Sequence, residues 1–183
     1  MVLSPISQAA IINNNHLFQK TQVIAQQLAA IRSQQSLSEL STEPQIYADK
    51  LAIHLVFKSQ QLSELAAKLQ QQHGLSPSAP ISVAYSVIRP RSVMPFLELL
   101  EQQLVAVVDK VGATKPKEVE RPLGKSVNDV YQQLVIIEAL FVDLVDRQGY
   151  SALANNLAII KGDLQQISQL KELPLSFAPL ENY

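Results

Sequence analysis

Apolar residues recur at helical spacing in five segments of the chain. The two clearest stripes are Val93, Leu97, Leu100, Leu104 and Val107, and Leu153, Leu157, Ile160, Leu164 and Ile167. Steps that alternate between three and four residues place side chains on one face of an α-helix. The pattern predicts helices at about residues 5–35, 43–73, 92–111, 126–148 and 151–173.

Residues that start or stop helices bracket these segments. The start signals are Ser4-Pro5, Thr42 to Gln45, and Ser126 with Asp129. Gly74 and Gly112 follow the second and third segments, where glycine readily ends a helix. Polar residues interrupt the apolar stripe of the segment at 5–35, and the run of three asparagines at 13–15 could divide this segment. We predict one helix there and keep a break at this run as the alternative.

The connectors suggest how the helices are joined. Residues 36–41 form a short link, which predicts an antiparallel hairpin of the first two helices. Residues 75–91 hold three prolines and four serines and predict an ordered crossover. Residues 112–125 could run back along a helix, but short antiparallel connections are commoner in bundles. We therefore expect the third and fourth helices to be antiparallel, with their starts at opposite ends.

Together these elements predict a single all-α domain over residues 1–183. Its architecture is an elongated bundle of four to five helices with the Pro/Ser-rich crossover lying on it. Composition agrees, because 47% of residues are hydrophobic and only 17% are charged. Disordered chains lack this much apolar surface.

Charge and cysteine content exclude several classes of protein. The net charge is -1 and the pI about 6.3, so no overall basic field would attract nucleic acid or anionic lipid. The chain has no cysteine and hence no disulfide or thiolate metal site. No apolar run is long enough for a membrane span. No basic residue precedes Lys20, so we expect a cytoplasmic protein, or a periplasmic one if a signal peptide has been removed.

Catalytic and metal-binding patterns are weak in this chain. Gly124-Lys125-Ser126 resembles the end of a phosphate-binding loop, but Val119 stands where the first glycine belongs. The three histidines are isolated from one another, so we expect no metal and no cofactor. The carboxylate pairs Glu98/Glu101 and Asp143/Asp146 fit exposed helix faces. The sequence therefore predicts a non-enzymatic protein, with an enzyme of unrecognised residues as a remaining alternative.

Two sets of residues are candidates for binding. Arg89 and Arg91 precede one helix, and Arg121 and Lys125 precede another, where backbone N–H groups and cations suit an anion. The simpler alternative is that these are solvated loop charges. Asn14, Thr21 and His54 are polar residues within apolar stripes and could mark an internal pocket. The alternative for His54 is a core histidine bonded to a carbonyl or to Asn14.

Glutamine is the commonest polar surface residue, with pairs such as Gln26-Gln27, Gln102-Gln103 and Gln165-Gln166. It favours helix and can pack against another helix without burying a charge. We therefore predict a module for protein interaction, sensing or scaffolding that self-associates as a homodimer, with no nucleic-acid partner. The alternative is a bundle that binds a small ligand in a polar pocket.

Overall fold

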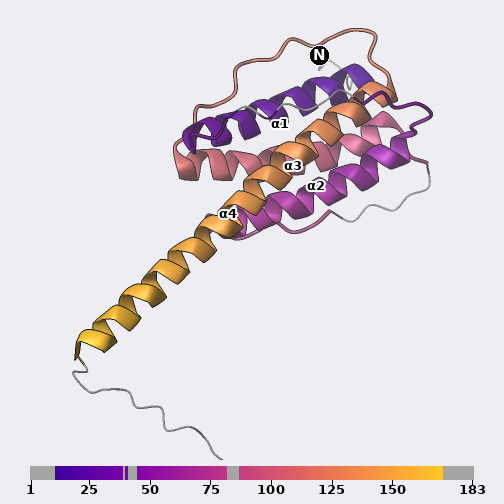
Figure 1. Cartoon of the computed structure of the whole chain (residues 1–183). Coiled ribbons are helices and arrows are strands. Elements are labelled where there is room, and N and C mark those ends of the chain that lie inside the picture. Colours follow the sequence, from indigo (N-terminus) through magenta and orange to yellow (C-terminus); the bar gives the residue numbers. More distant parts are fainter. Residues whose placement is uncertain (1–10, 39, 41–44, 82–86, 171–183) are drawn as a thin grey trace, which may run out of the picture. The chain divides into compact units, whose positions relative to one another are not determined.

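The chain is all-α, as the periodicity predicts. The computed structural model describes residues 11–38, 40, 45–81 and 87–170, with the backbone alone at 147–158 and 162–170. Its helices are α1 (Asn14–Gln34), α2 (Ala52–Gln72), α3 (Pro90–Val111) and α4 (Val127–Leu170) (Figure 1). These four helices hold 21, 21, 22 and 44 residues, well over half of the 183 residues of the chain, whereas globular proteins average about a third. None of the described residues lies in a strand.

The chain divides into one unit of residues 1–145 and a second of residues 146–183. In the first unit, α1, α2, α3 and residues 127–145 of α4 pack into a four-helix bundle. α3 contacts both α1 and α2. The second unit contains the remaining part of α4.

Hydrogen bonds fix the direction of α4 in this bundle. Near the start of α1, the backbone N–H of Lys125 donates to Asn15 Oδ1 (2.8 Å), and near its end Arg32 pairs with Asp143. The start of α2 also lies beside the start of α4, where the Lys50 N–H donates to Asn128 Oδ1 (2.9 Å). α1, α2 and α4 are therefore mutually parallel.

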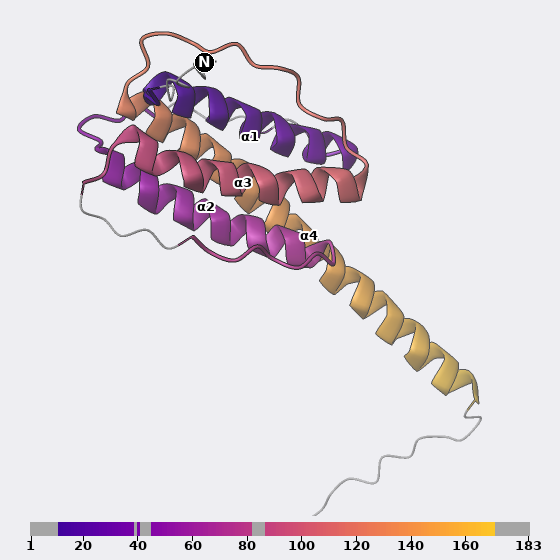
Figure 2. The same ribbon diagram turned by 180° about the vertical axis from the view of Figure 1, so that it is seen from behind.

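The connector between α3 and α4 shows that α3 has the same direction. Its Lys117 N–H donates to Gln26 Oε1 (3.1 Å), and further along the Val119 carbonyl accepts from Gln19 Nε2 (2.6 Å). The connector thus runs backwards along α1, from the end of α3 to the start of α4, as Figures 1 and 2 show. All four helices are parallel, and all begin at one end of the bundle, here called the helix-start end.

The expected antiparallel pairs are therefore wrong for helices 1 and 2 and for helices 3 and 4. The link before α2 is longer than predicted, because α2 begins at Ala52 and not near residue 43. Residues 45–51 are not helical, and Asp49 has a left-handed φ of 58°, which an α-helix does not accommodate. Thr42 and Pro44 of the predicted start lie outside the described residues.

The asparagine run starts α1. Asn13 is the residue before the helix, and its side chain accepts from the Asn15 N–H at 3.1 Å. Asparagine is a preferred residue at this position because its side chain satisfies a free N–H of the first turn. Residues 11–13 are not helical, so the prediction of one unbroken helix over 5–35 is wrong, and residues 5–10 lie outside the described residues. Ser4-Pro5 lies outside the described residues.

Other helix ends follow the sequence more closely. Gly74 and Gly112 have left-handed φ angles of 70° and 68° and end α2 and α3 as predicted. α3 begins two residues early, at Pro90, which places Pro95 in its second turn. The two helices predicted at 126–148 and 151–173 are one helix, α4. A single glycine, Gly149, costs a helix only about 1 kcal/mol and does not end it.

The core consists of the predicted stripes. Fully buried apolar side chains occur on every helix, among them Ile24, Leu28, Leu62, Leu97, Leu134 and Phe141. Buried polar side chains are fewer among the described residues and are Thr21, Gln27, Arg32, Ser59, Gln70 and Gln103. No described helix is both long and apolar enough for a membrane crossing.

Candidate functional site

The parallel arrangement brings the predicted binding residues to the helix-start end. Arg89 precedes α3 and Arg91 is its second residue, while Arg121 and Lys125 lie in the connector just before α4. Asn14 is the first residue of α1, and His54 lies in the first turn of α2. The sequence placed the two basic pairs at opposite ends, and the parallel helices contradict that expectation.

One cluster joins the start of α1 to the connector before α4. Arg121 Nη1 lies 2.7 Å from His16 Nε2, while His16 Nδ1 lies 2.8 Å from Asn13 Oδ1. A guanidinium only donates hydrogen bonds, so Nε2 accepts from Arg121, while Nδ1 lies near both Asn13 Oδ1 and the Asn13 backbone N–H (3.3 Å). The Lys125 ammonium lies over the Phe18 ring, 4.4 Å from its centre. Asn14 Oδ1 is buried here and has no partner among the described residues.

A second cluster joins the start of α2 to that of α4. The Tyr47 and Tyr131 rings meet edge to face, with centres 5.0 Å apart. The Lys50 ammonium lies 4.7 Å from the centre of the Tyr131 ring and 5.5 Å from that of Tyr47. Cation–π contacts of this kind orient an ammonium without neutralising it. The cluster therefore holds a positive charge at the helix-start end.

His54 is a helix cap and is only partly buried. Its Nδ1 accepts from the Leu51 N–H at 2.9 Å, which satisfies a free donor of the first turn. It makes no bond to Asn14. Thr21 is fully buried and donates to the Phe18 carbonyl at 2.7 Å.

Ser126 and Asp129 cap α4 as the sequence predicts. Asp129 Oδ2 accepts from the Ser126 N–H (2.7 Å) and hydroxyl (2.6 Å). The Ser126 hydroxyl, followed by the Ser126 N–H, lowers the pKa of Asp129, because both bonds favour the carboxylate. In the string that resembles a phosphate loop, the serine thus serves the cap and the lysine lies over Phe18.

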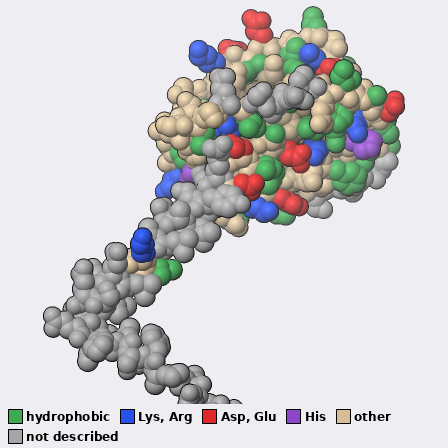
Figure 3. Space-filling model, viewed as in Figure 1, with side chains coloured by type: hydrophobic (Ala, Val, Ile, Leu, Met, Phe, Trp, Pro, Cys, Tyr) green, Lys and Arg blue, Asp and Glu red, His purple; other side chains and the backbone are tan. Residues whose placement is uncertain are grey.

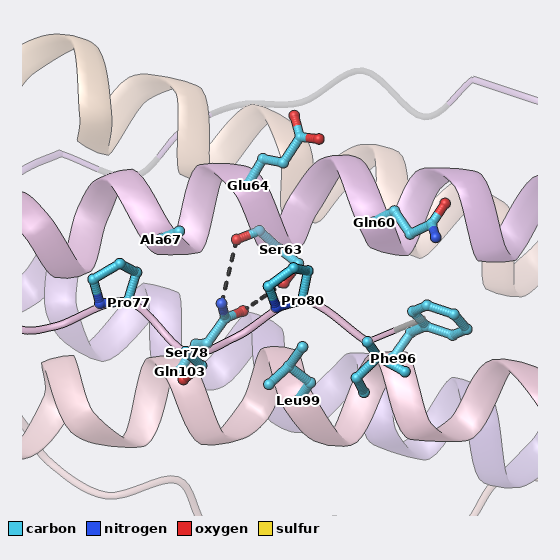
Figure 4. Close-up of a pocket in the computed structure, with 11 residues that line it drawn as sticks. Gln60, Ser63, Glu64, Ala67, Pro77, Ser78, Pro80, Phe96, Leu99 and Gln103 are labelled. Atoms are coloured by element: carbon cyan, nitrogen blue, oxygen red, sulfur yellow. Dashed lines mark hydrogen bonds between the residues drawn. The ribbon is translucent and has the colours of Figure 1, made fainter. Parts of the chain in front are cut away.

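A cavity of about 530 Å³ lies elsewhere, between α2, α3 and residues 77–81 of the crossover (Figure 4). Its apolar wall includes Ala67, Pro80, Phe96 and Leu99. One side is polar, where Gln103 Oε1 accepts from the Ser63 hydroxyl at 2.9 Å. Asn14, Thr21 and His54 do not line this cavity.

Next to the cavity, two buried glutamines join α2, α3 and the crossover through hydrogen bonds. Gln70 and Gln103 are 2% and 1% exposed, and Gln70 Nε2 donates to the Gln103 carbonyl at 3.2 Å. Gln70 Oε1 in turn accepts from the Ser78 N–H in the crossover at 3.4 Å. These bonds attach the start of the crossover to α2 and α3, in agreement with the expectation for its first residues; residues 82–86 of the predicted crossover lie outside the described residues.

The sequence missed several residues of the helix-start end. Tyr47 and Lys50 were assigned to a helix, although their segment is a connector, and no sequence signal connects either residue to Tyr131. In the part of the chain that the structure describes, no group of three or more histidines and carboxylates could hold a metal ion.

Comparisons with protein-family models, with curated proteins and with solved structures give no significant match.

Proposed function

We propose that the protein is a non-enzymatic interaction module that self-associates through residues 146–170 of α4. The observation that carries this proposal is the exposure of two large aliphatic side chains there, 61% for Ile159 and 54% for Ile160. Ile160 belongs to the stripe predicted from the sequence in this segment. An amphipathic helix gains most of its stability from burying its apolar face against a partner.

A second copy of the chain is the partner that this segment fits. Its stripe of Leu153, Leu157, Ile160, Leu164 and Ile167 alternates steps of four and three, the spacing of a coiled-coil seam. Such a seam is complementary to itself. The nearby Asn155, Asn156, Gln165 and Gln166 carry no charge that would oppose close approach.

Light scattering on the purified full chain, from micromolar to high micromolar concentration, tests this proposal. We expect a mass near 40 kDa, twice the 20.2 kDa of one chain. Leu157→Glu with Leu164→Glu places like charges in the seam and should raise the dimer Kd at least ~100-fold. Asn155→Glu with Gln169→Glu adds the same charge away from the seam and should leave the dimer intact.

A strictly monomeric wild-type protein would contradict self-association. So would a dimer that tolerates the two seam glutamates. Since the substitutions lie in α4 beyond the bundle core, thermal unfolding of residues 1–145 should be unchanged and serves as the folding control.

The cavity under the crossover supports a second candidate function, the binding of a small, largely apolar molecule. Its volume lies within the range of known ligand sites, and Ser63 and Gln103 supply polar groups on one wall. In a thermal-shift screen, a ligand of this cavity should raise the melting temperature of the wild-type protein. Ala67→Leu should fill the cavity and abolish that shift, whereas a shift that persists in this variant would place the ligand elsewhere.

A further inference from the structure

The helix-start end exposes an aliphatic side chain from the segment before every helix. These residues are Ile11, Ile46, Leu51, Val87 and Leu123, with exposed fractions of 87, 95, 63, 65 and 83%. Ile11 precedes α1, Ile46 and Leu51 precede α2, and the other two precede α3 and α4. Because the helices are parallel, all five belong to one end. Single exposed aliphatics are common on folded domains, but a set that shares one end of the bundle is a candidate interaction surface.

The opposite end of the bundle differs. The residues that follow α1, α2 and α3 include Leu37, Leu75 and Ala113, and all three pack against the core. At the helix-start end Ile12 and Ile88 also pack against the core, yet the aliphatic residue before each of them is exposed. Helix geometry alone does not require this contrast, because either end could be packed in the same way.

Basic side chains accompany the exposed aliphatics. They are Lys50, Arg89, Arg91, Arg121 and Lys125, and none forms an ion pair with a carboxylate among the described residues. Ion pairs occur instead at Lys20–Glu101, Arg32–Asp143, Lys58–Glu138 and Lys115–Asp109. Among the described residues, the acidic ones near the helix-start end are Asp49, Glu118, Glu120 and Asp129, the last of which caps α4. The five basic residues thus exceed the acidic ones there by a single charge.

The parallel helices add to this charge. Each helix start carries free N–H groups and about half a positive charge from its dipole, and an all-parallel bundle places four such starts together. The net charge of -1 for the whole chain does not reveal this local positive charge. On the face in Figure 3, basic and acidic side chains alternate over the bundle with hydrophobic ones between them. The expectation of no overall basic field concerns the whole chain, whereas the helix starts add positive potential only at this end.

We propose that the helix-start end docks on a membrane surface rich in anionic lipid. Aliphatic side chains on four separate segments can enter the headgroup region, while neighbouring arginines and lysines contact lipid phosphates and carboxylates. A bilayer fits because it accepts several separate apolar points and negative charge at once. The cavity between α2 and α3, by contrast, is not lined by these residues. The proposal goes beyond self-association and involves none of the α4 seam.

Flotation of the full chain with vesicles tests the proposal. We expect binding to vesicles of phosphatidylcholine with about 30% phosphatidylserine, and at least ~10-fold weaker binding to phosphatidylcholine alone, because polybasic surfaces require anionic lipid. Binding should also weaken as salt is raised. The seam variant Leu157→Glu/Leu164→Glu should still bind, which separates this result from that of the self-association test.

Matched variants locate the surface. Ile46→Ser with Leu123→Ser should weaken vesicle binding at least ~10-fold by removing inserted side chains. Val105→Ser is the control, since Val105 is 41% exposed but lies near the end of α3, away from the helix starts. Arg89→Gln with Arg91→Gln should weaken binding similarly, whereas Lys68→Gln with Lys117→Gln should not. Circular dichroism confirms that each variant is folded.

Three outcomes would overturn the proposal. The first is no binding to either vesicle, and the second is equal loss of binding in the Val105 control and the helix-start variants. The third is binding of the wild-type chain to polyglutamate without binding to vesicles, which would assign the surface to an acidic protein.

Discussion

Replacing Asp143 with alanine is expected to destabilise the bundle by about 3–5 kcal/mol. Asp143 on α4 pairs with Arg32 on α1, whose side chain is only 5% exposed. Arg32 also donates from Nη2 to the Ser38 carbonyl at 2.6 Å. Without Asp143 the guanidinium keeps that one bond but loses its counter-charge. Urea unfolding followed by circular dichroism measures the effect.

Asp109→Ala is the matched control for this prediction. Asp109 pairs with Lys115 at 3.3 Å, but the two side chains are 55% and 77% exposed. Water screens such a pair, so its loss should cost less than about 1 kcal/mol. The double variant Arg32→Met/Asp143→Leu should recover most of the lost stability, because it removes the buried charge with its partner. Equal costs for the two single alanine variants would contradict the buried-pair interpretation.

Asp143 also illustrates a limit of sequence reasoning. With Asp146 it formed a carboxylate pair that fitted an exposed helix face, and Asp146 is exposed. Asp143 instead contacts an arginine 111 positions away. Similarly, Glu101 pairs with Lys20 of α1. Helical spacing shows which residues share a face, but it does not show which helix lies opposite.

Heptad stripes and glycine stops were predictable because their causes are local. Val93, Leu97 and Leu104 share a face whatever their neighbours are, and Gly112 ends α3 through its own left-handed conformation. Helix direction was not predictable in this way. A connector such as 112–126 is long enough either to run back along the bundle or to form a loose turn. Its hydrogen bonds to α1 show that it runs back.

The candidate site likewise has features that were predictable from the sequence and features that were not. Arg89, Arg91, Arg121 and Lys125 were identified because a basic residue before a helix start is visible in the sequence. Their common location depends on parallel helices, which was not visible. Lys50 was missed because its segment reads as the first turns of a helix, whereas the Tyr47–Tyr131 contact shows it to be a connector held against α4.

Shortening the connector between α3 and α4 should abolish the native bundle. α3 has 22 residues, so a return along it covers about 33 Å at 1.5 Å per residue. Fifteen residues separate Val111 from Val127 and can span that distance easily. Deleting residues 114–121 leaves seven, which reach at most about 25 Å. We expect the loss of cooperative unfolding and of the dispersed NMR spectrum of a packed core.

An insertion separates this length effect from the loss of connector contacts. Eight glycines and serines placed between Thr114 and Lys115 leave the bonds of Lys117 and Val119 to α1 available. Loop entropy predicts a cost of only about 0.4 kcal/mol for the longer connector. If α3 and α4 were antiparallel, the seven remaining residues would join them comfortably and the deletion would be tolerated. A deletion variant that unfolds cooperatively at the wild-type urea midpoint would therefore refute the parallel arrangement, and with it the gathering of four helix starts at one end.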